Sequence, residues 1–170
     1  MHAALPKRLS AHRLALHGEV VEGSVAIAGL ARLSGMLADA GGEINARLEF
    51  GQREGRDTVL LSIDGEAVLQ CQRCLGSVRW PLHAVVSLEL VASDAEAQRV
   101  TEPAEPYSVV DDVLEPWQVV EDEAILALPV IARHTDEAQC DPLAELAPEP
   151  PEERPANPFA VLKDWKKPRQ

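Results

Sequence analysis

The sequence predicts an α+β fold, in which an antiparallel, curved sheet carries one packed helix and precedes a flexible acidic C-terminal region with a short terminal helix. Three observations lead to this fold class. Apolar and polar residues alternate through much of residues 43–91, a helix-like segment covers residues 117–128, and prolines and acidic residues dominate residues 141–155. A chain of 170 residues is expected to form one domain with appendages. We assign residues 1–140 to a single domain and residues 141–170 to a flexible acidic segment with a basic tail.

The N-terminal quarter combines a basic arm with mixed patterns. Residues 1–28 begin irregularly and then alternate loosely, which is typical of a bent strand or a hairpin. Leucines then recur at helical spacing between Leu30 and Leu37. This spacing predicts a short helix that ends at Gly41-Gly42.

The central part of the chain has the clearest strand patterns. Residues 43–50 place apolar side chains on one face and polar side chains on the other, and residues 58–63 repeat this pattern after a polar turn at 51–55. Asp64-Gly65 is typical of a hairpin turn, and residues 79–91 again have a strand pattern. Sequential strands with short turns predict an antiparallel meander.

One helix is expected after an acidic loop. Residues 92–112 are acidic and contain two prolines, so we expect a loop or linker there. Glu115-Pro116 can open a helix, because proline is tolerated at the first helical position, and Leu128-Pro129 closes it. Residues 121–123 read Glu-Asp-Glu. Consecutive helical side chains point in different directions and cannot easily converge on one ion, so we interpret these three as a solvated acidic helix start.

The charge of the chain is distributed unevenly. Residues 94–153 hold 17 acidic and two basic residues, whereas residues 154–170 hold five basic residues and one acidic residue. The net charge of the whole chain is −12. Binding to nucleic acid is normally signalled by a basic face, so we expect a basic protein partner to be bound more strongly than RNA.

Three cysteines and one histidine form the main candidate site. Cys71 and Cys74 belong to a Cys-x-x-Cys motif, and Cys140 lies six residues after His134. Borderline-soft Zn²⁺ prefers sulfur and nitrogen ligands, and four protein ligands leave no open position. The sequence therefore predicts a structural zinc site. Two alternatives stay open at this point, namely unrelated cytosolic thiols and a redox pair formed by Cys71 and Cys74.

No catalytic motif accompanies this cluster. The chain lacks a glycine-rich phosphate loop, a Gly-x-Ser-x-Gly motif and a His-Glu-x-x-His motif. We therefore predict no enzymatic activity and no small-molecule substrate. An odd number of cysteines without a secretory signal predicts a cytoplasmic protein, and no apolar run approaches the roughly 20 residues of a membrane span.

Apolar residues recur close to the C-terminus. Phe159, Leu162 and Trp165 stand in a short window beyond the Pro-Glu-rich segment, and Asn157-Pro158 can start a helix there. We expect this window to dock on a partner. The alternative is that it packs on its own domain.

Three stretches in order resemble a known family. These are the Cys71–Cys74 motif after a strand, the run 120–129 followed by His134 and Cys140, and Asn-Pro-Phe-Ala-Val-Leu at 157–162. Together they resemble the YceD-type family of bacterial large ribosomal RNA accumulation proteins. The resemblance implies a non-catalytic role in the synthesis, processing or stability of 23S ribosomal RNA. It departs at Ala132, where many relatives carry a second proline.

From this resemblance and the charge pattern we predict a ribosome-biogenesis factor. The expected partner is a basic ribosomal protein or an rRNA-processing factor, and direct contact with rRNA stays open. The alternative is a metal-containing or thiol-redox enzyme that uses Cys71 and Cys74.

Overall fold

A computed structural model describes residues 3–136 and Cys140 of the chain. Its strands are β1 (Leu9–Ser10), β2 (Val20–Ala26), β3 (Glu43–Arg53), β4 (Arg56–Gln70), β5 (Ser77–Val91), β6 (Glu105–Ser108) and β7 (Val113–Leu114). Its α-helices are α1 (Ala11–His17), α2 (Ala31–Ser34), α3 (Asp94–Ala97) and α4 (Pro116–Leu126), and a 3-10 turn covers Ile27–Gly29. The predicted α+β fold class is confirmed.

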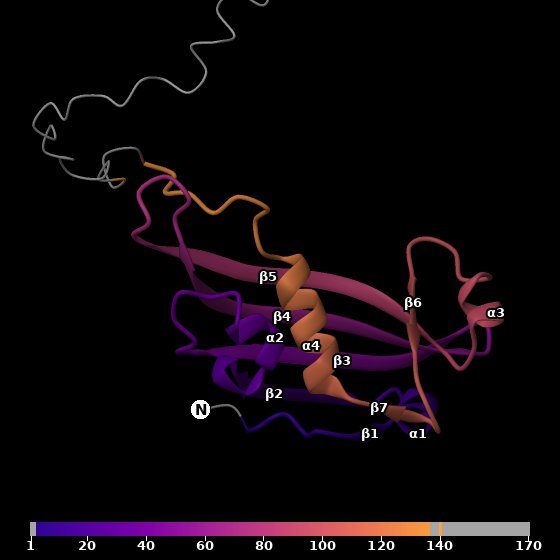
Figure 1. Ribbon diagram of the computed structural model, residues 1–170. Coiled ribbons are helices and arrows are strands. Elements are labelled where there is room, and N and C mark those ends of the chain that lie inside the picture. The colour runs from indigo at the N-terminus through magenta and orange to yellow at the C-terminus, as the bar shows by residue number, and fades with distance from the viewer. Residues whose placement is uncertain (1–2, 137–139, 141–170) are drawn as a thin grey trace, which may run out of the picture.

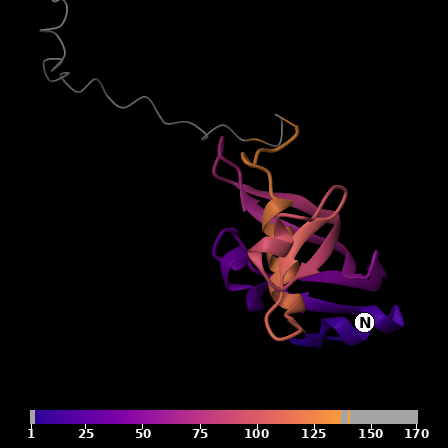
Figure 2. The same ribbon diagram turned by 90° about the vertical axis from the view of Figure 1, so that its right-hand side faces the viewer.

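The main sheet has five strands in the order β2-β3-β4-β5-β6. The first four form an antiparallel meander, with Leu48 opposite Leu61 and Leu61 opposite Val86. β6 joins the edge of β5 in parallel orientation. The sheet is therefore mixed at one edge, and the two views show that it is strongly twisted (Figures 1 and 2).

Helix α4 lies across one face of this sheet (Figure 1). The inward-facing side chains of β3 and β4 are buried, as their alternating pattern predicts. They pack against α1, α2 and α4 in one core that includes Leu14, Leu33, Leu48, Leu61 and Val120. Helix α4 begins at Pro116, as predicted, and ends at Leu126, slightly before the expected stop at Pro129.

The N-terminal arm covers the outer edge of β2. The amide of Leu5 donates to the carbonyl of Ser24, and the amide of Ser24 donates to the carbonyl of Ala3. A Cβ atom at Gly23 would lie 2.8 Å from the Ala3 carbonyl oxygen, so only glycine fits this close approach. The indole of Trp117 in α4 donates to the Leu5 carbonyl and fixes the arm against the helix.

Several local predictions are wrong. Asp64-Gly65 is no turn, because β4 continues through both residues and pairs with His83 and Leu82 of β5. Residues 92–112 are not only a loop, since they contain α3 and β6. The basic arm contains helix α1, and the helix expected from Leu30 to Leu37 is limited to Ala31–Ser34.

None of the described helices has the length and apolar character that a membrane-spanning helix requires. The expected terminal helix and the docking residues Phe159, Leu162 and Trp165 lie outside the described residues, as does the segment 141–170. Their roles stay predictions.

Candidate metal centre

The four residues predicted as metal ligands come together at one end of the sheet. Cys71 and Cys74 belong to the turn between β4 and β5, whereas His134 and Cys140 belong to the segment that follows α4. Their candidate ligand atoms all lie within 4.8 Å of one another. Both views place this turn beside the segment after α4 (Figures 1 and 2). Residues from two distant parts of the chain therefore form a group that could bind a metal.

The spacing of the ligand atoms fits tetrahedral coordination. With zinc–sulfur bonds of about 2.3 Å and zinc–nitrogen bonds of about 2.0 Å, the edges of such a tetrahedron are about 3.8 Å between sulfurs and about 3.5 Å from sulfur to nitrogen. The sulfurs of Cys71 and Cys140 are 3.7 Å apart, and the Cys74 sulfur lies 3.5 Å from Nδ1 of His134. A disulfide would require about 2.05 Å, so the three cysteines are free thiols.

The turn that carries the two cysteines is closed by the backbone. The amide of Cys71 donates to the carbonyl of Gly76 (2.8 Å), and the amide of Leu75 donates to the carbonyl of Cys71 (2.9 Å). Leu75 has a φ of +62°, in the left-handed region that disfavours side chains with a Cβ atom. The turn therefore holds both sulfurs on the same side at the expense of local strain at Leu75.

The orientation of His134 is fixed by a hydrogen bond behind the ring. Nε2 lies 3.0 Å from the carbonyl oxygen of Ser77, and a carbonyl can only accept, so Nε2 carries the proton. Nδ1, which faces the sulfurs, is left with its lone pair. Such an outer contact is typical of metal-binding histidines because it sets both the tautomer and the angle of the ring.

The electrostatic environment differs between the two buried thiols. Hydrogen bonds to the sulfur of Cys71, first from the amide of Cys74 and also from that of Arg73, outweigh burial and lower the pKa of Cys71 to about 5. Burial and the neighbouring sulfurs raise the pKa of Cys140 to about 11. The three sulfurs could all be thiolates only with a cation among them, and a divalent metal would supply that charge.

A small apolar cluster surrounds the site. It contains Leu69, Cys71, Val78, Ala132 and Cys140, with Trp80 and Leu128 packed against it. The amide of Gln72 donates to the carbonyl of Ala132 and connects the cysteine turn to the segment after α4. Trp80 and Leu128 also pack against the main core, so the small cluster continues the hydrophobic interior up to the candidate site.

We expect Leu75→Gly to stabilise the protein slightly. Leu75 is 56% exposed, so little packing is lost, whereas the left-handed conformation costs a side chain about 1–2 kcal/mol. Part of this gain is offset by the greater freedom of glycine in the unfolded chain. The expected rise in melting temperature is about 2–4 °C, measured by thermal unfolding with unchanged metal content. A lower melting temperature would show that the Leu75 side chain contributes more by packing than it costs in strain.

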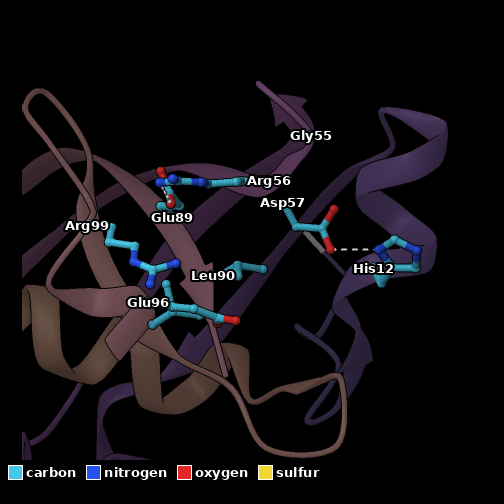
Figure 3. A pocket seen from close by; sticks show the side chains of 9 residues that line it. His12, Gly55, Arg56, Asp57, Glu89, Leu90, Glu96 and Arg99 are labelled. Atoms are coloured by element: carbon cyan, nitrogen blue, oxygen red, sulfur yellow. Dashed lines mark hydrogen bonds and ion pairs between the residues drawn. The ribbon is translucent and has the colours of Figure 1, made fainter. Parts of the chain in front are cut away.

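A second cluster of polar side chains lines a cavity of about 350 Å³ at the ends of β4 and β5 (Figure 3). Nδ1 of His12 lies 2.8 Å from Asp57, and Arg56 donates to the buried Glu89 at 2.7 Å. These contacts pair the charges with one another. Among the described residues, the lining holds no serine, threonine or cysteine.

Sequence reasoning found the four candidate ligands but misjudged Glu121. The Glu121 side chain is buried, not solvated. Its carboxylate accepts hydrogen bonds from the amides of Arg32 and Leu33 and from the Arg32 side chain. It therefore caps the start of α2 from a different helix. A sequence pattern in α4 alone could not reveal this role, because the partner lies 89 residues away.

Fold and site together define an α+β protein in which a close group of three thiols and one imidazole joins a sheet turn to the segment after a helix. A family model described as large ribosomal RNA subunit accumulation protein YceD matches residues 59–166, which include all four candidate ligands. The chain belongs to the YceD family. No solved structure matches it. The family description connects the protein with accumulation of large-subunit ribosomal RNA.

Proposed function

We propose that this protein is a non-catalytic assembly factor of the large ribosomal subunit, and that Cys71, Cys74, His134 and Cys140 hold one structural zinc ion. The observation that supports the zinc site is the closeness of the four candidate ligand atoms, which all lie within 4.8 Å of one another and include two separations that fit tetrahedral coordination. Family membership supports the role in rRNA accumulation. We further propose that residues 1–140 act as one domain in the cytoplasm.

A structural role for the metal is favoured by the ligand set. Four protein ligands leave no position for a substrate or a water molecule, which is the pattern of structural zinc sites. Cys71 and Cys140 are almost completely buried. Zinc would contribute a cross-link between the β4–β5 turn and the segment after α4, and thereby fix the end of the sheet.

The acidic surface supports a basic protein as the direct partner. Burial is the largest cause that raises the pKa of Tyr107 to about 12, and the nearby Asp122, Glu115 and Glu123 add to it. Glu105 and Asp122 likewise add to the effect of burial in raising the pKa of Glu123, so several carboxylates lie close together here. Such a surface attracts cations at low salt and repels a phosphate backbone. A ribosomal protein or an rRNA-processing factor fits this requirement better than naked RNA.

A thiol oxidoreductase is the second candidate, and the lowered pKa of Cys71 favours it, because redox-active cysteines are usually ionised near neutral pH. Redox cysteines are also partly accessible, whereas Cys71 has no exposed surface. The two candidates differ in a simple experiment. A redox pair would cycle with dithiothreitol in the absence of metal, and a structural zinc site would not.

Cells that lack this protein are expected to contain less 23S relative to 16S ribosomal RNA and an excess of free small subunits. Too few large subunits would be available to pair with the small ones. Sucrose-gradient profiles with RNA quantification measure both quantities, and a plasmid copy of the intact gene is the control. A normal profile and RNA ratio in rich medium and in the cold would contradict the proposed function.

A further inference from the structure

No described element covers the face of the sheet opposite α4. Outward-facing residues of β2, β4 and β5 are exposed, with Val20, Leu60 and Val85 between 40% and 58% accessible. In Figure 1 this is the far face, behind α4. An antiparallel sheet can leave one face in water, but polar side chains normally cover it. This face combines apolar residues with an excess of carboxylates.

A small cavity of about 220 Å³ lies on this face, where β2, β3, β4 and β5 are adjacent. It is lined by Glu22, Gly23, Asn45, Ala46, Arg47, Ser62, Ile63, Asp64 and His83. Small-molecule sites usually measure about 300–1,000 Å³. A cavity below that range has room for a single side chain.

The available hydrogen-bonding groups of the cavity are mainly acceptors. The guanidinium of Arg47 already donates to both Glu22 and Glu49, so it is not counted among the available donors. The Asp64 side chain is 80% exposed and contacts only His83, at 3.6 Å, among the ion pairs of the described residues. Asn45 faces Asp64 across the β3–β4 ladder, and Ser62 faces Arg47. An incoming donor would therefore meet a carboxylate, an amide and a hydroxyl.

Asn45 provides an independent sign of a missing donor. Its Oδ1 is shielded from solvent and accepts no hydrogen bond from the described residues. A buried acceptor without a partner destabilises the folded protein, so a donor that reaches it is favoured. The χ2 torsion of asparagine is broad, so the amide can turn toward a donor in the cavity at little cost.

We propose that this cavity binds one arginine or lysine side chain of the basic protein partner, an inference that rests on the proposed function and locates its interaction surface. The aliphatic stem of the bound residue lies against the apolar parts of the floor, and its charged head reaches Asp64, Asn45 and Ser62. Long basic side chains combine these two properties. A phosphate backbone does not, because the same carboxylates repel it.

Titration of the ¹⁵N-labelled full chain tests this inference. The probe is the peptide acetyl-Gly-Arg-Gly-Arg-Gly-amide, and its control is the same peptide with citrulline, which keeps the shape of arginine without its charge. Saturable shifts are expected at the amides of residues 45, 47, 62, 64 and 83 with the arginine peptide only. A lysine peptide shows which cation is preferred.

Two variants test whether the peptide binds in this cavity. Asp64→Asn removes the exposed carboxylate and should weaken peptide binding about three- to fivefold, and Ser62→Leu should fill the cavity and abolish it. Asp111→Asn is the matched control, because Asp111 is exposed outside the cavity lining and asparagine tolerates its positive φ. Shifts centred elsewhere, unchanged binding by both variants, or stronger shifts with a uridine oligonucleotide would overturn the inference.

A cellular measurement separates this inference from the proposed function. Cells that carry Asp64→Asn or Ser62→Leu should have a lower ratio of 23S to 16S RNA than cells that carry Asp111→Asn. If the deletion lowers this ratio while both cavity variants leave it normal, the inference fails and the proposed function stands. If the deletion itself has no effect, the proposed function fails, and the peptide titration still decides whether the cavity binds a cation.

Discussion

Replacing Cys71 by serine is expected to abolish stoichiometric zinc binding and to lower the melting temperature by more than 10 °C. Serine is a poor zinc ligand, and the remaining three residues cannot complete a closed tetrahedral site. In zinc-finger peptides, metal binding provides about 10–16 kcal/mol of apparent free energy. This domain has a core of its own and depends less on zinc, but zinc would join Cys140 and His134 to the β4–β5 turn.

Elemental analysis of protein purified without chelators measures the metal, and calorimetry measures the melting temperature. Gln72→Ala is the matched control, because Gln72 lies between the two cysteines, is exposed and uses only its backbone amide to bind Ala132. It should retain one zinc ion per chain. Replacement by Co²⁺ should give the intense visible bands of tetrahedral thiolate coordination. Sub-stoichiometric metal in the intact protein, together with unchanged melting of Cys71→Ser, would contradict the zinc site.

The candidate metal ligands could be predicted because their residue types alone indicate the chemistry of the site. Every cysteine of the chain takes part, and sulfur and imidazole ligands indicate a soft or borderline metal without knowledge of the fold. The hydrogen bond from His134 to Ser77 was not predictable, because it depends on where the segment after α4 meets β5. The strain at Leu75 likewise follows from the closed turn and not from its neighbours in sequence.

The fold was predictable where local pattern and tertiary structure agree. Residues 43–50 alternate strictly and form part of β3, and Glu115-Pro116 starts α4. The prediction of a turn at Asp64-Gly65 was wrong because β5 pairs with both residues and β3 also pairs with Asp64, and these partners hold a turn-forming pair within a long strand. β6 was missed because a four-residue strand with a proline carries almost no pattern of its own.

The cavity on the open sheet face could not be predicted from the sequence, for a different reason. Asn45, Ser62, Asp64 and His83 are ordinary polar residues on the exposed side of their strands. Their convergence on one cavity follows from the register between β3, β4 and β5, which the wrong turn at Asp64-Gly65 would have broken. A shift of one residue would turn all these side chains to the opposite face.

Glu121→Ala is expected to destabilise the protein by about 3 kcal/mol, the value for removing one partner of a buried, hydrogen-bonded charge. Helix α2 has no side-chain cap of its own, and the Glu121 carboxylate accepts from its amides at Arg32 (2.7 Å) and Leu33 (3.1 Å). Without it, the buried Leu33 amide has no acceptor. The Arg32 guanidinium adds less, since it is half exposed and also contacts Asp122.

The pH dependence of stability provides a second test of the role of Glu121. Burial raises the pKa of Glu121, but the amides of Leu33 and Arg32 and the Arg32 guanidinium outweigh it, so the pKa is lowered. An acid with a lowered pKa stabilises the folded state above its unfolded pKa of about 4.3, and this contribution disappears as the pH falls through the folded value. Chemical denaturation of the intact protein should therefore show a loss of stability below about pH 4.5 that is smaller in Glu121→Gln.

Glu123→Gln is the matched control for the Glu121 variants, because both residues belong to α4 but their pKa values are shifted in opposite directions. Burial, Glu105 and Asp122 raise the pKa of Glu123, so removal of its charge should leave stability at neutral pH unchanged or slightly higher. Glu121→Gln keeps one oxygen for the two amides and should lie between the intact protein and Glu121→Ala. Equal stability of the Glu121 and Glu123 variants at neutral pH would mean that α2 is held by its core contacts alone, without the carboxylate of α4.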